Sequence, residues 1–179
     1  MTTWVGLLRG INVGKAKRLP MADLKRLVEG AGYTDARTLL NSGNVVFRGE
    51  AGAPERIAAR LERAVEETAG FHATVVVLSS DTLATVVAEN ALASLVDDPA
   101  RLLVAFVQDA SRLEAVRPLA ARAWEGATLA VGSKAAYAWC PGGILESGAL
   151  EAMGRLLKDQ VTTRNWATVQ KLAALAGCG

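Results

Sequence analysis

The order of strand-like and helix-like segments in the first 78 residues constrains the fold of this chain more than any other feature. Short runs of apolar and β-branched residues are typical of buried strands, and apolar residues spaced three and four positions apart are typical of helices. This pattern predicts strands at Val5–Arg9, Arg37–Leu40, Asn44–Arg48 and Ala73–Leu78, with helices that begin at Pro20 and at Pro54. The resulting order, β-α-β-β-α-β, is that of the split-βαβ or ferredoxin-like fold.

The second half of the chain repeats this order with one difference. We expect a strand at Leu102–Val107, a hairpin across the turn GSK, and a helix around Leu150–Leu157. A last helix, Trp166–Ala176, stands where the closing strand of the repeat would be. The sequence therefore predicts an α+β fold of two ferredoxin-like repeats with antiparallel sheets, packed as one compact unit. The first repeat spans 1–79, and the second is incomplete and spans 80–179 with the C-terminal helices.

The split-βαβ topology brings three connections to one rim of the first sheet. With the strands in the order 4-1-3-2, the loop after the first strand, the hairpin NSGN and the segment Gly70–His72 share an edge. Cations, amides, a hydroxyl and glycines gather there without a carboxylate, and this set favours an anion or a phosphate ester over a metal ion. The candidate ligand-binding residues at this rim are Arg9, Asn12, Lys15, Asn41, Ser42 and Asn44.

Ordinary structural roles are an alternative for several rim residues. Asparagine adopts left-handed backbone conformations and bonds its own backbone, so turn formation alone accounts for the asparagines, but it does not require Arg9 or Lys15. His72 titrates in a range suited to acid–base catalysis, although a lone histidine at the start of a strand is more often an ordinary surface residue. No residue is therefore assigned a catalytic role.

The stretch GINVGKA resembles a phosphate-binding loop but lacks its spacing. A nucleotide P-loop needs four residues between its first glycine and the GK pair, followed by Ser or Thr. Here the gap is one residue short and Ala16 replaces the hydroxyl. The GxGxxG spacing of dinucleotide-binding loops is absent as well. Both motifs are excluded, and no cofactor is assigned.

The segment VTTRNW near the C-terminus contributes two further candidates, Arg164 and Asn165. Asn165, or one of the threonines before it, can cap the last helix, and Trp166 begins the buried stripe of that helix. Capping does not explain Arg164, because a cation at a helix N-terminus opposes the helix dipole. An acidic side chain or an anionic ligand at the same terminus would stabilise it, and the sequence does not choose between them.

Composition excludes several classes of function. The chain has one histidine and two distant cysteines outside any CxxC pattern, so no metal site is expected. Ser42 lacks the partners of a hydrolase triad. No apolar run approaches the roughly 20 residues of a membrane span, and two thiols without a disulfide framework suit a reducing compartment. We expect a cytoplasmic protein without a membrane partner.

Two signatures in the chain resemble a bacterial family. The residues LLRGINVGKAKRLPMADLKRLVEGAGYTDARTLLNSGNVVF (Leu7–Phe47) and TTRNWATVQKLAALA (Thr162–Ala176) are similar to the domain-of-unknown-function family 1697. The resemblance implies a compact α+β protein with ferredoxin-like repeats, and it supplies no activity. One departure concerns a Ser-Lys pair associated with the helix before the second signature, which is Ser147-Gly148 here. If that lysine serves a site, this chain lacks one cation there.

Three kinds of function are compatible with these features. The rim residues favour a protein that binds, or turns over, a small phosphorylated or anionic ligand. The net charge is only +2, but residues 1–26 carry +5, which keeps an RNA- or single-strand-binding module as an alternative despite few aromatic residues on the strands. Exposed hairpin edges would also suit an interaction protein that forms a homodimer. Whether the protein is an enzyme is left open.

Overall fold

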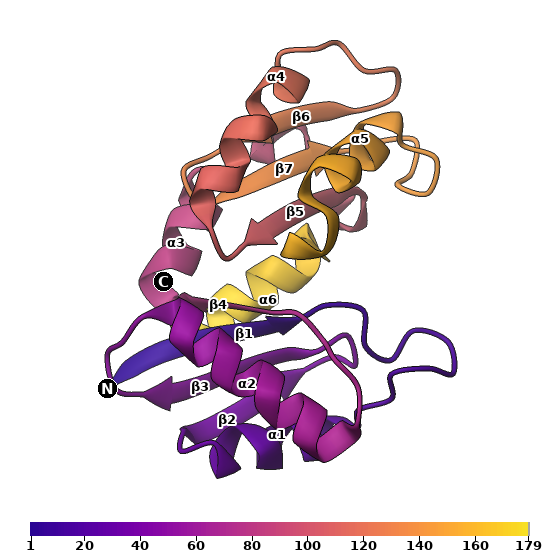
Figure 1. Ribbon diagram of the computed structural model, residues 1–179. Helices are drawn as coiled ribbons and strands as arrows, with labels where there is room; N and C mark the ends of the chain where they lie inside the picture. Colours follow the sequence, from indigo (N-terminus) through magenta and orange to yellow (C-terminus); the bar gives the residue numbers. More distant parts are fainter. Residues whose placement is uncertain (179) are drawn as a thin grey trace. The chain divides into compact units, whose positions relative to one another are not determined.

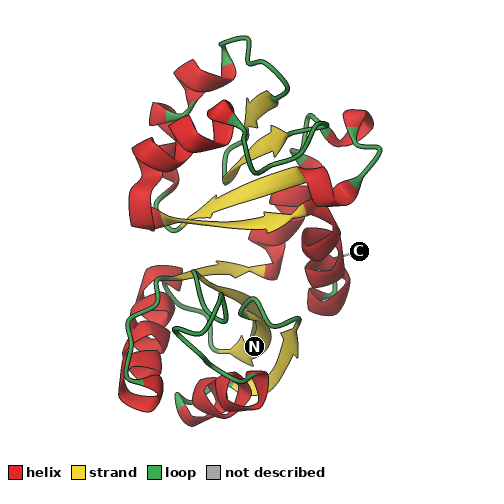
Figure 2. Ribbon diagram, turned by 90° about the vertical axis from the view of Figure 1, so that its right-hand side faces the viewer, coloured by secondary structure: helices red, strands yellow, loops and turns green. Residues whose placement is uncertain are grey.

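The structure is a computed structural model that describes residues 1–178, and these divide into two compact units. The first unit contains Met1–Leu83 together with the C-terminal residues from Leu172 onward, and the second contains Ala84–Lys171. Each unit has one four-stranded antiparallel sheet with helices (Figure 2), so the predicted α+β fold with two ferredoxin-like repeats is confirmed. The C-terminal residues belong with the first unit, where Arg37 Nη2 donates to the carbonyl oxygen of Leu175 at 3.1 Å.

The first unit has the element order expected from the sequence (Figure 1). Its elements are β1 (Thr2–Leu8), α1 (Met21–Gly30), β2 (Thr34–Leu39), β3 (Asn44–Gly49), α2 (Pro54–Ala69) and β4 (Val75–Ser79). The sheet order is β2-β3-β1-β4, which is the predicted order 4-1-3-2. The central strand β1 pairs antiparallel with both neighbours, with Val5 opposite Val46 on β3 and Leu78 on β4.

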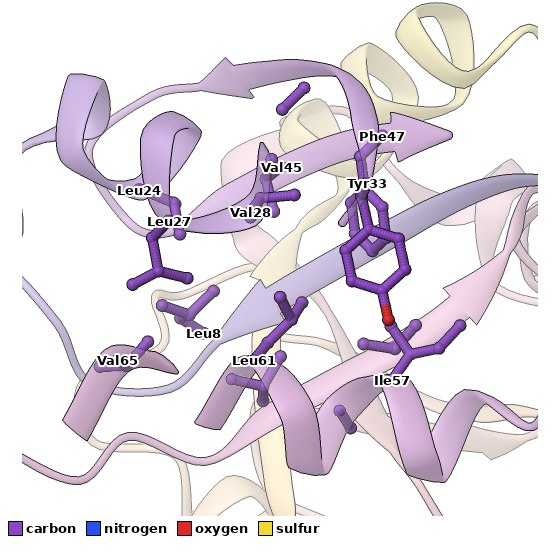
Figure 3. Packing of buried hydrophobic residues seen from close by; sticks show 14 of the residues in the cluster. Leu8, Leu24, Leu27, Val28, Tyr33, Val45, Phe47, Ile57, Leu61 and Val65 are labelled. Carbon is purple, nitrogen blue, oxygen red and sulfur yellow. The ribbon is translucent and has the colours of Figure 1, made fainter. Parts of the chain in front are cut away.

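The apolar stripes of α1 and α2 pack on one face of this sheet (Figure 3). Alternate strand residues such as Leu8 and Phe47 point to the helices, which contribute Leu27 and Leu61 to the same cluster. The Phe47 ring lies 4.8 Å from that of Tyr33, measured between centroids, in a tilted arrangement. Burial of each large side chain stabilises the fold by about 1.5–3 kcal/mol, so this core fixes both helices and therefore the loops that connect them to the sheet.

The second unit repeats the topology of the first, with the strand order β6-β7-β5-β8. Its elements are β5 (Leu102–Val107), α4 (Arg117–Ala120), β6 (Thr128–Val131), β7 (Ala135–Trp139), α5 (Gly148–Leu157) and β8 (Val161–Asn165). A 3₁₀ segment at Ala110–Ala115 precedes α4, which has Pro118 in its first turn, where a missing N–H costs nothing. The boundaries between the two units fall within two helices, α3 (Ser80–Ala88) and α6 (Trp166–Ala176).

The strand β8 is a difference from the sequence-based expectation, which has no closing strand in the second repeat. It pairs antiparallel with β5, with Val161 opposite Val107 and Asn165 opposite Leu103. The β-branched run Val161–Thr163 favours extended backbone, because such side chains restrict χ1 in helices. The repeat is therefore complete, and α6 follows the closing strand instead of replacing it.

Tyr137 is a fully buried residue of β7 whose hydroxyl donates to the carbonyl oxygen of Val86 at 2.5 Å. Burial raises the pKa of its phenol above the usual value, and the nearby Glu89 carboxylate adds to the shift. The Glu89 carboxylate itself accepts hydrogen bonds from the hydroxyl and the backbone N–H of Ser133, which lower its pKa. The phenol thus stays protonated in the folded protein at pH values where an exposed tyrosine ionises.

This predicts a pH-dependent effect of Tyr137→Phe. At neutral pH the variant should lose about 1–2 kcal/mol of unfolding free energy with the hydrogen bond to Val86. Because the pKa is raised on folding, the stabilisation is complete below the ordinary tyrosine pKa, 10.0, and declines above it. The advantage of the natural protein over the variant should shrink by about 1.4 kcal/mol per pH unit above that value. Urea unfolding of both proteins between pH 7 and pH 11 measures this difference, and a constant difference would contradict the assignment.

Candidate functional site

The loop between β1 and α1 has an unusual backbone. Gly10, Asn12 and Gly14 have φ values of 66°, 55° and 64°, while the residues between them have negative φ. Lys17, further along, is also left-handed, with φ of 51°. Backbone segments in which φ alternates in sign can form concave arrangements of N–H groups that bind anions. Within this loop the N–H of Asn12 donates to the carbonyl oxygen of Lys17 at 3.0 Å, which closes the turn.

The side chain of Asn12 holds this loop closed. Its Nδ2 donates to the carbonyl oxygen of Leu19 at 2.9 Å, and its Oδ1 accepts from the N–H of the same residue at 2.8 Å. The same Nδ2 also donates to the carbonyl oxygen of Asn41 at 2.8 Å, which connects the loop to the hairpin between β2 and β3. The amide of Asn12 is therefore a structural connection between two of the three segments predicted to meet at the rim.

The hairpin between β2 and β3 is fixed by a second amide. Asn44, which is fully buried, donates from Nδ2 to the carbonyl oxygen of Leu39 at 2.8 Å and to Ser42 Oγ at 2.9 Å. Gly43 has φ of 89° and its carbonyl oxygen accepts the N–H of Leu8 at 2.8 Å, so the hairpin continues the sheet up to the end of β1.

The third segment of the rim, just before β4, is tied to the first by one backbone hydrogen bond. The N–H of Arg9 donates to the carbonyl oxygen of Thr74 at 2.9 Å. His72 lies 3.0 Å from Glu66, measured between Nδ1 and Oε1, and both side chains are more than half exposed. Glu66 is not among the sequence candidates, because its position near His72 depends on where α2 ends relative to β4.

Several side chains at the rim are exposed to solvent. Arg9, Lys15, Lys17 and Arg18 place four cations there, and Asn41 and Ser42 are exposed in the hairpin. Two aliphatic side chains are exposed as well, Val13 at 73% and Leu40 at 51%. Within residues 1–178, the backbone N–H groups of Gly10, Gly14 and Lys15 have no hydrogen-bond acceptor. These N–H groups and the cations are the donors that an anion would meet.

Arg164 and Asn165 lie in the second unit, on β8. Asn165 Oδ1 accepts the N–H of Thr168 at 2.9 Å, so the expected cap of the last helix is present. Arg164 is a buried strand residue rather than the first residue of a helix, and its Nη1 donates to Thr162 Oγ1 and to the carbonyl oxygen of Thr163, both at 2.8 Å. Burial lowers the pKa of Arg164 to about 10, so the side chain stays charged at neutral pH.

Residues 1–178 contain no group of three or more His, Cys, Asp or Glu side chains placed to hold a metal ion. None of the helices within these residues is long and apolar enough to cross a membrane. A groove of about 580 Å³ between α1 and α2 is lined by none of the candidate residues of the rim, and its lining mixes acids with bases, including Asp23, Arg26, Arg60 and Glu67.

Comparison with known proteins yields a family and a fold. The family model described as "Protein of unknown function (DUF1697)" matches residues 1–137, a stretch that includes the first signature, Leu7–Phe47. The chain is also similar to the solved structure of conserved bacterial protein SP0830 from Streptococcus pneumoniae, with 21% sequence identity, a TM-score of 0.74 and 98% of each chain covered. At this identity the likeness concerns the fold alone. No curated protein matches the sequence.

Proposed function

We propose that this chain, which belongs to the DUF1697 family of proteins of unknown function, binds a small phosphorylated or otherwise anionic ligand at the rim of its first sheet. The rim is defined here as the loop between β1 and α1, residues 9–20, together with the hairpin residues 40–44. The proposal concerns binding, and it assigns no residue a catalytic role.

The observation that carries the proposal is the sign alternation of φ from Arg9 to Gly14. Nests of this kind bind phosphate and other anions because several N–H dipoles point at one place. The N–H groups of Gly14 and Lys15 lack acceptors within residues 1–178, so they are available to a ligand. A left-handed conformation costs little at glycine and is tolerated by asparagine, but it is uncommon at lysine, and the strain at Lys17 is of the kind that clusters at functional sites.

The charges of the loop agree with this backbone arrangement. Arg9, Lys15, Lys17 and Arg18 are exposed, and neither the loop nor the hairpin contains a carboxylate. Charge-assisted hydrogen bonds from such cations are about twice as strong as neutral ones. Asn12 and Asn44 serve the site indirectly in this proposal, because their amides are engaged with backbone and hydroxyl groups that fix the loop and the hairpin.

A nucleic-acid-binding role is less well supported by the same structure. Split-βαβ domains that bind RNA stack bases on aromatic side chains of the open sheet face. The aromatic residues of β1 and β3, Trp4 and Phe47, instead belong to the buried cluster beneath α1 and α2, with exposures of 4% and 0%. The rim loops contain no aromatic residue.

Titration with inorganic phosphate and pyrophosphate tests the proposal. We expect both anions to raise the melting temperature, with about 2.7 kcal/mol of stabilisation when the free anion is 100 times its Kd. Lys15→Gln and Arg9→Gln should each weaken binding about tenfold, because each removes a charged donor. Arg48→Gln, which removes an exposed cation from the far part of β3, is the matched control and should leave the affinity within about twofold. Absence of any shift with either anion would refute the proposal.

A further inference from the structure

We infer that the anion bound at the rim carries an aliphatic group, so that alkyl phosphates and similar amphiphilic anions are better ligands than nucleotides or free phosphate. This inference rests on the proposed function, because it names the class of ligand for the same site. It is carried by a second set of side chains at the rim, which are apolar rather than charged.

Two of the exposed large aliphatic side chains lie in the rim loops. Val13 is 73% exposed and Leu40 is 51% exposed. Each is next in sequence to a partner in the hydrogen bond of 2.8 Å between Asn12 Nδ2 and the carbonyl oxygen of Asn41. Both residues are therefore adjacent in sequence to the point where the loop and the hairpin are hydrogen-bonded, and the same loop carries the exposed cations Lys15, Lys17 and Arg18.

The backbone of Leu40 indicates that its exposure is more than a by-product of the turn. Leu40 has φ of 58°, in the left-handed region that leucine seldom occupies. Asparagine or glycine would hold the same turn with less strain, as Gly43 does three residues later with φ of 89°. Leu40 thus exposes apolar surface at a strained backbone position, and strained positions cluster at ligand-binding sites.

The composition of the rim separates an aliphatic ligand from a nucleotide. Residues 9–20 and 40–44 contain no aromatic side chain on which a base could stack and no carboxylate that could accept hydrogen bonds from ribose hydroxyls. In the neighbouring segment before β4, Phe71 is half-buried against the core cluster, and the exposed His72 is already paired with Glu66 at 3.0 Å. Aliphatic side chains gain from contact with alkyl groups in proportion to the area removed from water.

A chain-length series provides the test. Binding of inorganic phosphate and of methyl, butyl and hexyl phosphate, each dissolved as a monomer, is measured by isothermal titration calorimetry. We expect the affinity to rise about two- to fourfold for each methylene that contacts Val13 or Leu40. Adenosine monophosphate should bind no more tightly than methyl phosphate. Equal affinities for hexyl and inorganic phosphate would overturn the inference while leaving the proposed function standing, whereas failure of every anion would remove the proposed function itself.

Two variants separate the aliphatic contact from the fold. Val13→Ser and Leu40→Asn should each reduce the dependence on chain length while leaving the affinity for inorganic phosphate within about twofold. Leu40→Asn should also raise the melting temperature of the free protein, because asparagine accepts the left-handed conformation, so loss of binding could not be ascribed to unfolding. Unchanged dependence on chain length in both variants would contradict the inference. Binding to vesicles that contain phosphatidic acid, without binding of dissolved alkyl phosphates, would contradict it too, since the ligand would then be a membrane surface.

Discussion

Replacement of Gly43 by alanine should destabilise the protein by about 3 kcal/mol, because the position combines a left-handed backbone with close packing. A Cβ atom built there would lie 2.8 Å from Leu8 Cβ and 2.9 Å from Ile11 Cδ1. The first of these atoms is fixed to the backbone of β1, so the clash cannot be relieved by rotating a side chain. The carbonyl oxygen of Gly43 accepts the N–H of Leu8, so a shift of the hairpin would also disturb this hydrogen bond.

Gly32→Ala is the matched control for this prediction. Its φ of 97° is close to the 89° of Gly43, and a Cβ there would meet nothing within 4 Å. The control therefore carries the left-handed strain alone and should cost about 1 kcal/mol. The difference between the two variants in urea-induced unfolding measures the cost of the close approach. Equal losses of stability would show that the hairpin does not pack against β1 as tightly as these distances indicate.

The first unit was predictable from sequence because its signals are local and agree with one another. The β-branched run Ala73–Leu78, the prolines at the starts of both helices and the hairpin signal NSGN each indicate the same element order. The topology then follows, because few strand orders are compatible with a split βαβ. The observed order β2-β3-β1-β4 is the one that this element order predicts, so no long-range contact had to be identified from the sequence.

The second unit was harder to predict because two signals overlap within a few residues. Val161–Thr163 favours a strand, and Asn165 with Trp166 starts a helix immediately afterwards. The strand β8 has only five residues, and the capping signal overlaps its end. The sequence pattern therefore indicates a helix N-terminus at Arg164 instead of a strand. The pairing of Arg164 with β5, where it lies opposite Val104, is a long-range contact that no local pattern contains.

The features that distinguish the rim were the least predictable from sequence. Nothing in the sequence around Leu40 indicates a left-handed backbone, since leucine avoids the left-handed region of φ and ψ. The partners of Asn12 are seven and 29 residues away, so its role follows only from the fold. Sequence composition could indicate that cations and glycines meet at one rim, but the alternation of φ signs in the loop is visible only in the structure.

Asn12→Asp should lower the free energy of unfolding by about 2–3 kcal/mol and weaken the binding of phosphate more than tenfold. One carboxylate oxygen can still accept the N–H of Leu19. The other would face the carbonyl oxygens of Leu19 and Asn41, to which the amide of Asn12 now donates at 2.9 and 2.8 Å. Two donated hydrogen bonds are replaced by contacts between acceptors, and aspartate tolerates the left-handed backbone almost as well as asparagine does, so φ strain contributes little.

Asn41→Asp separates the position of the amide from the charge that the substitution introduces. Its side chain is exposed in the same rim, and it meets the loop through its backbone carbonyl oxygen, which the substitution keeps. Both variants place one negative charge near the cations of the loop, so the two should share any electrostatic weakening of anion binding. Only Asn12→Asp should also lose stability in urea and show the larger loss of phosphate affinity in calorimetry. If both variants lose the same affinity at unchanged stability, the connection between loop and hairpin is not what positions the N–H groups, and the charge of the rim alone would account for binding.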